Sequence, residues 1–166
     1  MGDSKTIVVY FSWGGITRTA AQAMAQRIGA DSYELVPVKP YPSSYDDTTY
    51  IAGGEVAAEA RPEIEGELPD LSAYETVILA MPLWWSAAPR IIFTFIEAVD
   101  LVGKKVLTFV TYGTLGMSGI DKAIRKALPG AGVVDGLAVP GKQASTTTTR
   151  EEIDSWLTKN GLTILS

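Results

Sequence analysis

Hydroxyl and glycine residues follow the first apolar run of the sequence in a pattern that suits phosphate binding. Residues 7–9 are β-branched and apolar, and apolar residues recur at helical spacing after residue 17. The turn between them reads Ser12, Trp13, Gly14, Gly15, Ile16, Thr17. Such a strand-to-helix turn directs free backbone N–H groups and the positive end of a helix dipole at one point, where a phosphate fits. The alternative is a tight turn, capped by Thr17, that holds no ligand.

The same turn lacks the marks of two common nucleotide sites. It has no lysine in the GxxxxGK pattern of P-loop proteins, which argues against hydrolysis of ATP or GTP. It also lacks the GxGxxG pattern of dinucleotide-binding folds.

Two further loops are expected at the same edge of a sheet, because ligands of parallel sheets sit at the carboxyl ends of the strands. The first follows residues 76–81 and contains Pro82, Leu83, Trp84 and Trp85. The second begins at the end of the strand 104–111 and contains Thr111, Tyr112 and Gly113. Together with the phosphate loop they predict a flat aromatic ligand that carries a phosphate. The alternatives are that one tryptophan is core, that Tyr112 is a surface residue and that the glycines only make turns.

Strand and helix patterns alternate five times along the chain. The expected strands are residues 5–11, 32–36, 76–81, 104–111 and 133–139, and the expected helices are residues 17–29, 50–61, 89–99, 118–128 and 150–160. Residues 37–49 are expected to form a loop because they hold three prolines, two serines and two aspartates. This alternation predicts an α/β fold in which a parallel sheet carries helices on both faces. The length of 166 residues suits a single domain over residues 1–166.

Composition excludes several classes of chemistry. The sequence has no cysteine and no histidine, which removes thiolate nucleophiles, disulfides, Ser-His-Asp catalysis and histidine-ligated zinc. A net charge of −5 argues against a nucleic-acid partner. No apolar run is long enough for a membrane span, and no signal peptide precedes the first strand, so we expect a cytoplasmic protein.

An acid-rich stretch over residues 45–75 holds a single base, Arg61. Such a run is most often a solvated face. If it lies near the ligand, it would disfavour added negative charge there and could steer a positively charged partner.

At these motifs the sequence resembles the flavodoxin-like proteins, in particular the bacterial branch. The resemblance extends over nearly the whole chain. It is carried by Val9-Tyr10-Phe11-Ser12, Gly15, Thr17-Arg18, Tyr41-Pro42, Tyr45, Arg61-Pro62, Leu71-Ser72, Tyr74-Glu75, Pro82, Trp84-Trp85, Ala88-Pro89, Phe95, Gly103-Lys104 and Gly136-Leu137.

The resemblance implies a five-stranded doubly wound sheet of order 2-1-3-4-5 and a non-covalently bound FMN. Ser12, Trp13, Gly14, Gly15, Ile16 and Thr17 would then hold the phosphate. Pro82, Leu83, Trp84 and Trp85 would edge and cover the isoalloxazine, and Thr111, Tyr112 and Gly113 would line its other side. No metal ligand and no catalytic residue of the protein itself is implied.

Two residues of the phosphate loop depart from the family pattern. Gly14 stands where Ser or Thr is usual, and Ile16 stands where Asn is usual. Each change removes a side-chain donor, which costs about 1–2 kcal/mol of phosphate binding if nothing replaces it. Backbone N–H groups remain to bind the phosphate.

Three functions follow as hypotheses. The first is an FMN electron carrier that serves an unidentified redox protein or small acceptor, in an oligomeric state that the sequence does not specify. The second is an FMN-dependent NAD(P)H:quinone-type reductase. The third, suggested by Gly14 and Ile16, is a flavodoxin scaffold that has weakened or lost its cofactor. A response-regulator receiver is excluded, because Met81-Pro82 stand where a phosphorylatable aspartate would be.

Overall fold

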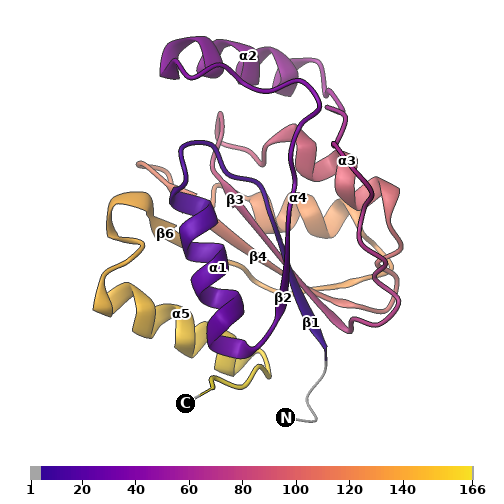
Figure 1. Cartoon of the computed structure of the whole chain (residues 1–166), viewed down its shortest axis with the longest axis vertical. Coiled ribbons are helices and arrows are strands. Elements are labelled where there is room, and N and C mark those ends of the chain that lie inside the picture. The colour runs from indigo at the N-terminus through magenta and orange to yellow at the C-terminus, as the bar shows by residue number, and fades with distance from the viewer. Residues whose placement is uncertain (1–4, 166) are drawn as a thin grey trace.

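The computed structural model describes residues 5–165 and contains a parallel sheet covered by helices on both faces (Figure 1). The strands are β1 (Thr6–Tyr10), β2 (Asp31–Glu34), β3 (Thr76–Pro82), β4 (Lys105–Tyr112), β5 (Gly132–Val133) and β6 (Leu137–Pro140). Their order is β2-β1-β3-β4-β5, with β6 also paired to β4. The predicted α/β fold and the predicted strand order are confirmed.

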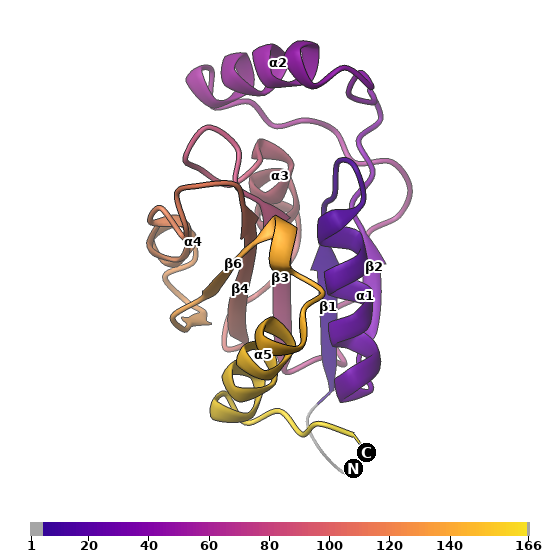
Figure 2. The ribbon, with the colours of Figure 1, turned by 90° about the vertical axis from the view of Figure 1, so that its left-hand side faces the viewer.

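Within residues 5–165, four helices form the two outer layers and a fifth stands apart from them. The helices are α1 (Ile16–Ile28), α2 (Tyr45–Ala57), α3 (Arg90–Ala98), α4 (Ile120–Ala127) and α5 (Thr147–Lys159), and a short 3-10 turn, η1, spans Gly141–Gln143. Helices α1 and α5 cover one face of the sheet and α3 and α4 cover the other (Figure 2). Helix α2 lies across the carboxyl edge of the sheet instead of on either face (Figures 1 and 2).

The alternation of side chains along each strand divides the core in two. In β1, Val8 and Tyr10 pack with the stripe Ala20, Ala21 and Met24 of α1. Ile7 and Val9 point the other way, toward a cluster that contains residues of α3 and α4. Strands buried on both faces explain why the sequence of the central strands is apolar throughout.

The predicted boundary between a loop over residues 37–49 and a helix over 50–61 is wrong. Helix α2 already begins at Tyr45. The side chain of Ser44 caps this helix by accepting a hydrogen bond of 3.3 Å from the N–H of Asp47. Asp46 and Asp47 lie in the first turn, where their negative charge suits the helix dipole. Helix α2 ends at Ala57, ahead of Pro62.

The predicted fifth strand over residues 133–139 is also wrong, because two short strands, β5 and β6, take its place beside β4. The break between them lies at Gly136, whose N–H donates to Asp121 Oδ2 at 3.1 Å. A Cβ at this position would lie 2.6 Å from the Thr108 carbonyl oxygen. The chain therefore leaves the ladder where a specific glycine packs against β4.

The other boundaries differ by a few residues from expectation. Strand β2 covers Asp31–Glu34 in place of 32–36, and α4 starts at Ile120 because Gly119 precedes it with a φ of 77°. Helix α5 starts at Thr147, capped by Thr146, and not at residue 150. Among the described helices, none is both long enough and apolar enough to cross a membrane.

Candidate ligand-binding site

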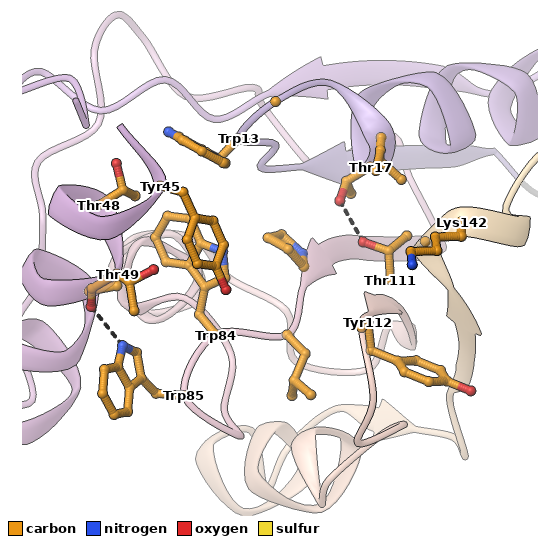
Figure 3. A pocket seen from close by; sticks show the side chains of 17 residues that line it. Trp13, Thr17, Tyr45, Thr48, Thr49, Trp84, Trp85, Thr111, Tyr112 and Lys142 are labelled. Atoms are coloured by element: carbon orange, nitrogen blue, oxygen red, sulfur yellow. Dashed lines mark hydrogen bonds between the residues drawn. The ribbon is translucent and has the colours of Figure 1, made fainter. Parts of the chain in front are cut away.

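A cavity of about 560 Å³ opens at the carboxyl edge of the sheet, below α2 (Figure 3). All three loops predicted from the sequence contribute to it, together with α2 and η1. Its lining residues are Trp13, Gly14, Ile16, Thr17, Tyr45, Thr48, Thr49, Ala52, Pro82, Leu83, Trp84, Trp85, Thr111, Tyr112, Gly113, Gly141 and Lys142. Of the predicted site residues, only Ser12 and Gly15 do not line it.

The loop between β1 and α1 turns on two consecutive glycines. Gly14 has a φ of 86° and Gly15 a φ of 99°, conformations that strain residues with a Cβ. Ser12 does not point into the cavity: its Oγ accepts a hydrogen bond of 3.1 Å from the Arg18 N–H and so caps α1. Gly15 lines a neighbouring cavity between α1 and α5 instead. The role of Ser12 is therefore to shape the turn.

Backbone N–H groups of this loop are free to bind an anion. No described residue accepts a hydrogen bond from the N–H of Gly14, Gly15, Ile16 or Thr17. Gly15 is the N-cap residue of α1 and has no side chain that could accept a hydrogen bond from these N–H groups. Unpaired N–H groups at the start of a thirteen-residue helix are the donors that a phosphate requires.

Two buried threonine hydroxyls join this loop to the end of β4. Thr17 Oγ1 and Thr111 Oγ1 lie 2.9 Å apart, and both residues are at most 5% exposed. One hydroxyl donates to the other, which leaves one of the two protons available to a ligand. The pair fixes the phosphate-type loop against the strand that forms the opposite wall (Figure 3).

The two tryptophans stand on a tight turn after β3. Trp84 and Ala87 exchange both backbone hydrogen bonds, and the residues between them, Trp85 and Ser86, have φ values of 54° and 59°. Left-handed backbone at two non-glycine residues stores strain, which is common at ligand-binding turns. The turn sends the two indoles in different directions, and both line the cavity.

Trp84 packs inward and Trp85 outward. The ring of Trp84 meets Phe11 edge-on at 5.2 Å and Tyr41 edge-on at 5.0 Å between centroids. Tyr41 donates to Glu55 Oε1 at 2.6 Å, and burial, reinforced by this carboxylate, raises the pKa of its phenol well above the ordinary value. Trp85 is 57% exposed and forms the outer rim.

Helix α2 is held over the cavity by indole N–H groups. Trp13 Nε1 donates to the Pro42 carbonyl at 3.0 Å, just ahead of the helix, and Trp85 Nε1 donates to the Thr49 carbonyl at 2.7 Å. The rings of Trp13 and Tyr45 also meet edge-on at 6.3 Å. Tyr45, Thr48 and Thr49 of α2 line the cavity (Figure 3). The overhanging helix therefore covers the aromatic end of the site.

The wall formed by β3 and β4 follows from their register. Pro82 pairs with Thr111, and the Leu83 N–H donates to the Thr111 carbonyl at 2.8 Å. These strands are therefore locked together up to the cavity. Tyr112 lies at the opposite side from Trp85 (Figure 3).

Sequence reasoning missed the contributions of α2 and η1. Ser44 followed three residues later by Asp47 is a helix-start signal, and recognising it would have placed Tyr45, Thr48, Thr49 and Ala52 on a helix near the site. Gly141 and Lys142 follow β6 as the other loops follow their strands, so the same edge rule would have found them. Within residues 5–165, no cluster of acidic residues is arranged to hold a metal ion.

Comparisons with known proteins agree with this geometry. The family model described as Flavodoxin matches residues 5–160. No curated protein sequence matches the chain.

Solved structures show the same architecture. A crystal structure assigned as a flavoprotein from Bacteroides uniformis superposes with a TM-score of 0.82 at 32% identity, over 93% of this chain and 98% of that one. A second, from Bacteroides eggerthii, gives 0.83 at 29% identity, over 97% and 100% of the two chains. A flavoprotein from Lactobacillus acidophilus, solved in complex with FMN, shares the fold with a TM-score of 0.72 at 19% identity, over 88% and 99%. The chain belongs to the flavodoxin family.

Proposed function

We propose that the chain binds FMN non-covalently in the cavity below α2 and acts as an electron carrier. The observation that carries this proposal is that the two ends of the cavity differ in chemistry. Unpaired backbone N–H groups at residues 14–17 occupy one end, and the indoles of Trp84 and Trp85 occupy the other. A ligand with a phosphate at one end and a flat aromatic system at the other matches both.

The cavity also lies where this family places its cofactor. Two of its walls are loops that follow β1 and β3. These strands are neighbours in the sheet although β2 lies between them in the sequence, so the strand order reverses between them. The N–H groups of Ile16 and Thr17 and one hydroxyl of the Thr17–Thr111 pair hold the phosphate. Pro82, Leu83, Trp84 and Trp85 hold one side of the ring system, and Tyr112 and Gly113 hold the other.

When bound, FMN supplies the electron chemistry, and the protein sets its position and potential. The surroundings described here favour a low reduction potential. The apolar aromatic walls oppose negative charge at the ring system, and the exposed acids Asp46 and Asp47, which follow Tyr45 on α2 outside the lining, add to this at longer range. A low potential suits a donor of single electrons to a redox protein or small acceptor.

The covering helix supports a carrier over an NAD(P)H reductase. A reductase needs room for a nicotinamide ring to stack on the flavin. Tyr45, Thr49 and Ala52 of α2 line the cavity from above, and the Trp85–Thr49 hydrogen bond holds α2 there. A one-electron carrier needs only an exposed edge of the flavin, and the rim of this cavity is formed by the exposed Trp85.

Two measurements test the proposal. Potentiometric titration of the FMN-loaded protein is expected to give two separate one-electron steps, the second at a potential well below that of free FMN. Steady-state oxidation of NADH or NADPH, with and without a quinone, is expected to show no turnover above free FMN. Rapid turnover with a quinone would show that the protein is a reductase and not a carrier.

We further propose that the chain acts as a single domain, in the cytoplasm.

A further inference from the structure

We propose that Lys142 is the positive charge that holds the FMN phosphate, in place of the side-chain donors that Gly14 and Ile16 lack. This inference rests on the proposed FMN binding and names the group that recognises the phosphate.

The backbone places Lys142 beside the phosphate-type loop. Strand β6 pairs with β4 up to Tyr112 and Pro140, so η1 emerges at the carboxyl edge next to the end of β4. Gly141 fits closely there: a Cβ on it would lie 3.6 Å from Ile16 Cγ2 and 3.7 Å from the Tyr112 carbonyl oxygen. The following residue, Lys142, lines the cavity, and its side chain points toward Thr111 (Figure 3).

Lys142 is also the single charged residue in the described lining of this cavity. The structure gives it no ion pair with a described carboxylate. A phosphate monoester carries nearly two negative charges at neutral pH. The chain has a net charge of −5, so its overall field repels a phosphate. A lysine in the cavity wall offsets this repulsion locally.

The cation that directly follows the phosphate-type loop in the sequence is already paired with a carboxylate. Arg18 follows the loop directly, but its guanidinium donates to Glu34 Oε2 through Nε at 3.1 Å and through Nη2 at 2.5 Å. Glu34, first by this hydrogen bond and then by its charge, raises the pKa of Arg18 further. Arg18 is therefore paired with β2. Arg150 lines the neighbouring cavity beside Gly14 and Gly15, so within the described residues Lys142 is the one cation in the wall of the cavity below α2 itself.

Side-chain donors to the phosphate are otherwise few. Ser12 Oγ faces the Arg18 N–H and does not line the cavity, and the Thr17–Thr111 pair retains one proton for a ligand. Ile16 presents methyl groups to Gly141, at the position where the family pattern has an asparagine with an amide donor. The ammonium of Lys142, with three donors, supplies from η1 what the loop itself lacks.

The test compares FMN with riboflavin, which lacks only the phosphate. Apo-protein is titrated with each flavin and quenching of flavin fluorescence is followed, for the wild type, Lys142→Gln and Lys126→Gln. Lys126 is the matched control, since it is an exposed lysine in the last turn of α4 and lines neither cavity. Lys142→Arg, which keeps the charge, serves as the rescue variant.

The proposal predicts that Lys142→Gln weakens FMN binding on the order of tenfold and leaves riboflavin binding unchanged. Added salt is expected to weaken FMN binding to the wild type more than FMN binding to Lys142→Gln. Salt screens the attraction between the lysine and the phosphate, and only the wild type has this attraction. Lys126→Gln is expected to bind both flavins as the wild type does, and Lys142→Arg to retain most FMN affinity.

Two other results would overturn the inference in different ways. If Lys142→Gln binds FMN as tightly as the wild type, or loses FMN and riboflavin equally, the lysine does not recognise the phosphate while FMN binding itself stands. If the wild type binds neither flavin, the proposed function fails together with this inference.

Discussion

The indole of Trp85 occupies the space that a side chain at Gly53 would need. A Cβ built on Gly53 would lie 2.8 Å from Trp85 Cε2, whereas one on the adjacent Gly54 would meet nothing within 4 Å. The same indole donates to the Thr49 carbonyl, one turn earlier on α2. The glycine thus lets the covering helix rest on the outer tryptophan of the site.

This contact makes opposite predictions for two neighbouring glycines. Gly54→Ala is expected to stabilise the protein by about 0.5–1 kcal/mol, because alanine favours the helix and no neighbour obstructs it. Gly53→Ala is expected to lose this gain, because the indole must move and give up its bond to Thr49. Urea unfolding of the apo-protein measures both. Equal stabilisation by the two variants would show that Trp85 does not rest on α2.

The buried hydroxyl pair predicts strong coupling between two distant positions. Thr17→Val alone is expected to destabilise the protein by about 1–3 kcal/mol, because it leaves the Thr111 hydroxyl buried without a partner. The double variant with Thr111→Val is expected to recover much of that loss, because neither hydroxyl is then left unpaired. A double-mutant cycle in urea gives the coupling energy. Additive effects would contradict the pairing.

The two tryptophans are expected to differ in what they stabilise. Trp84→Ala should lower the free energy of unfolding of the apo-protein by about 2–3 kcal/mol, since its half-buried ring packs between Phe11 and Tyr41. Trp85→Ala should cost about 1 kcal/mol, since its ring is 57% exposed and makes one hydrogen bond. Thermal or urea unfolding compares them. A larger loss at Trp85 would reverse their assigned roles.

Alkaline pH should destabilise the protein through Tyr74. Its hydroxyl donates to Asp31 Oδ2 at 2.5 Å, and this hydrogen bond raises the pKa of Tyr74 to about 12 from an ordinary 10.0. The folded state therefore holds the proton that the unfolded chain releases. Stability from this group is complete below pH 10 and falls as the pH rises from 10 to about 12.

Tyr74→Phe removes this part of the alkaline dependence. Its free energy of unfolding, measured in urea from pH 8 to 11, is expected to fall less steeply than that of the wild type. Tyr50→Phe is the control, since Tyr50 is 83% exposed and makes no hydrogen bond with a described residue. Parallel curves for Tyr74→Phe and the wild type would rule out the Asp31 contact as the cause.

The sequence predicts those parts of this molecule whose signals are local. Periodicity located the central strands, because β1, β3 and β4 are buried on both faces and hence apolar throughout. The edge rule for parallel sheets then brought three distant loops, including Thr17 and Trp84, to one cavity. Both inferences depend on properties that each segment carries alone.

The parts that were missed depend on contacts between segments. Glycines 53 and 54 lower the intrinsic helix propensity of this segment, yet Gly53 is required by the indole of Trp85. The break between β5 and β6 depends on Thr108, which leaves no room for a side chain at Gly136. Lys142 gains a role because β6 returns beside β4, and the edge rule finds it only once β6 is recognised as a strand of its own. The partners of Gly53 and Gly136 cannot be identified from spacing along the chain.

The central claim is that one FMN binds below α2, and the visible spectrum of the purified protein tests it most directly. Apo-protein mixed with excess FMN and passed through gel filtration is expected to emerge yellow, with one flavin per chain and absorption bands shifted from those of free FMN. Bound FMN should also raise the melting temperature, by an increment that grows with the logarithm of the FMN concentration above the dissociation constant. A colourless protein, with no shift in melting temperature at any FMN concentration, would contradict the account.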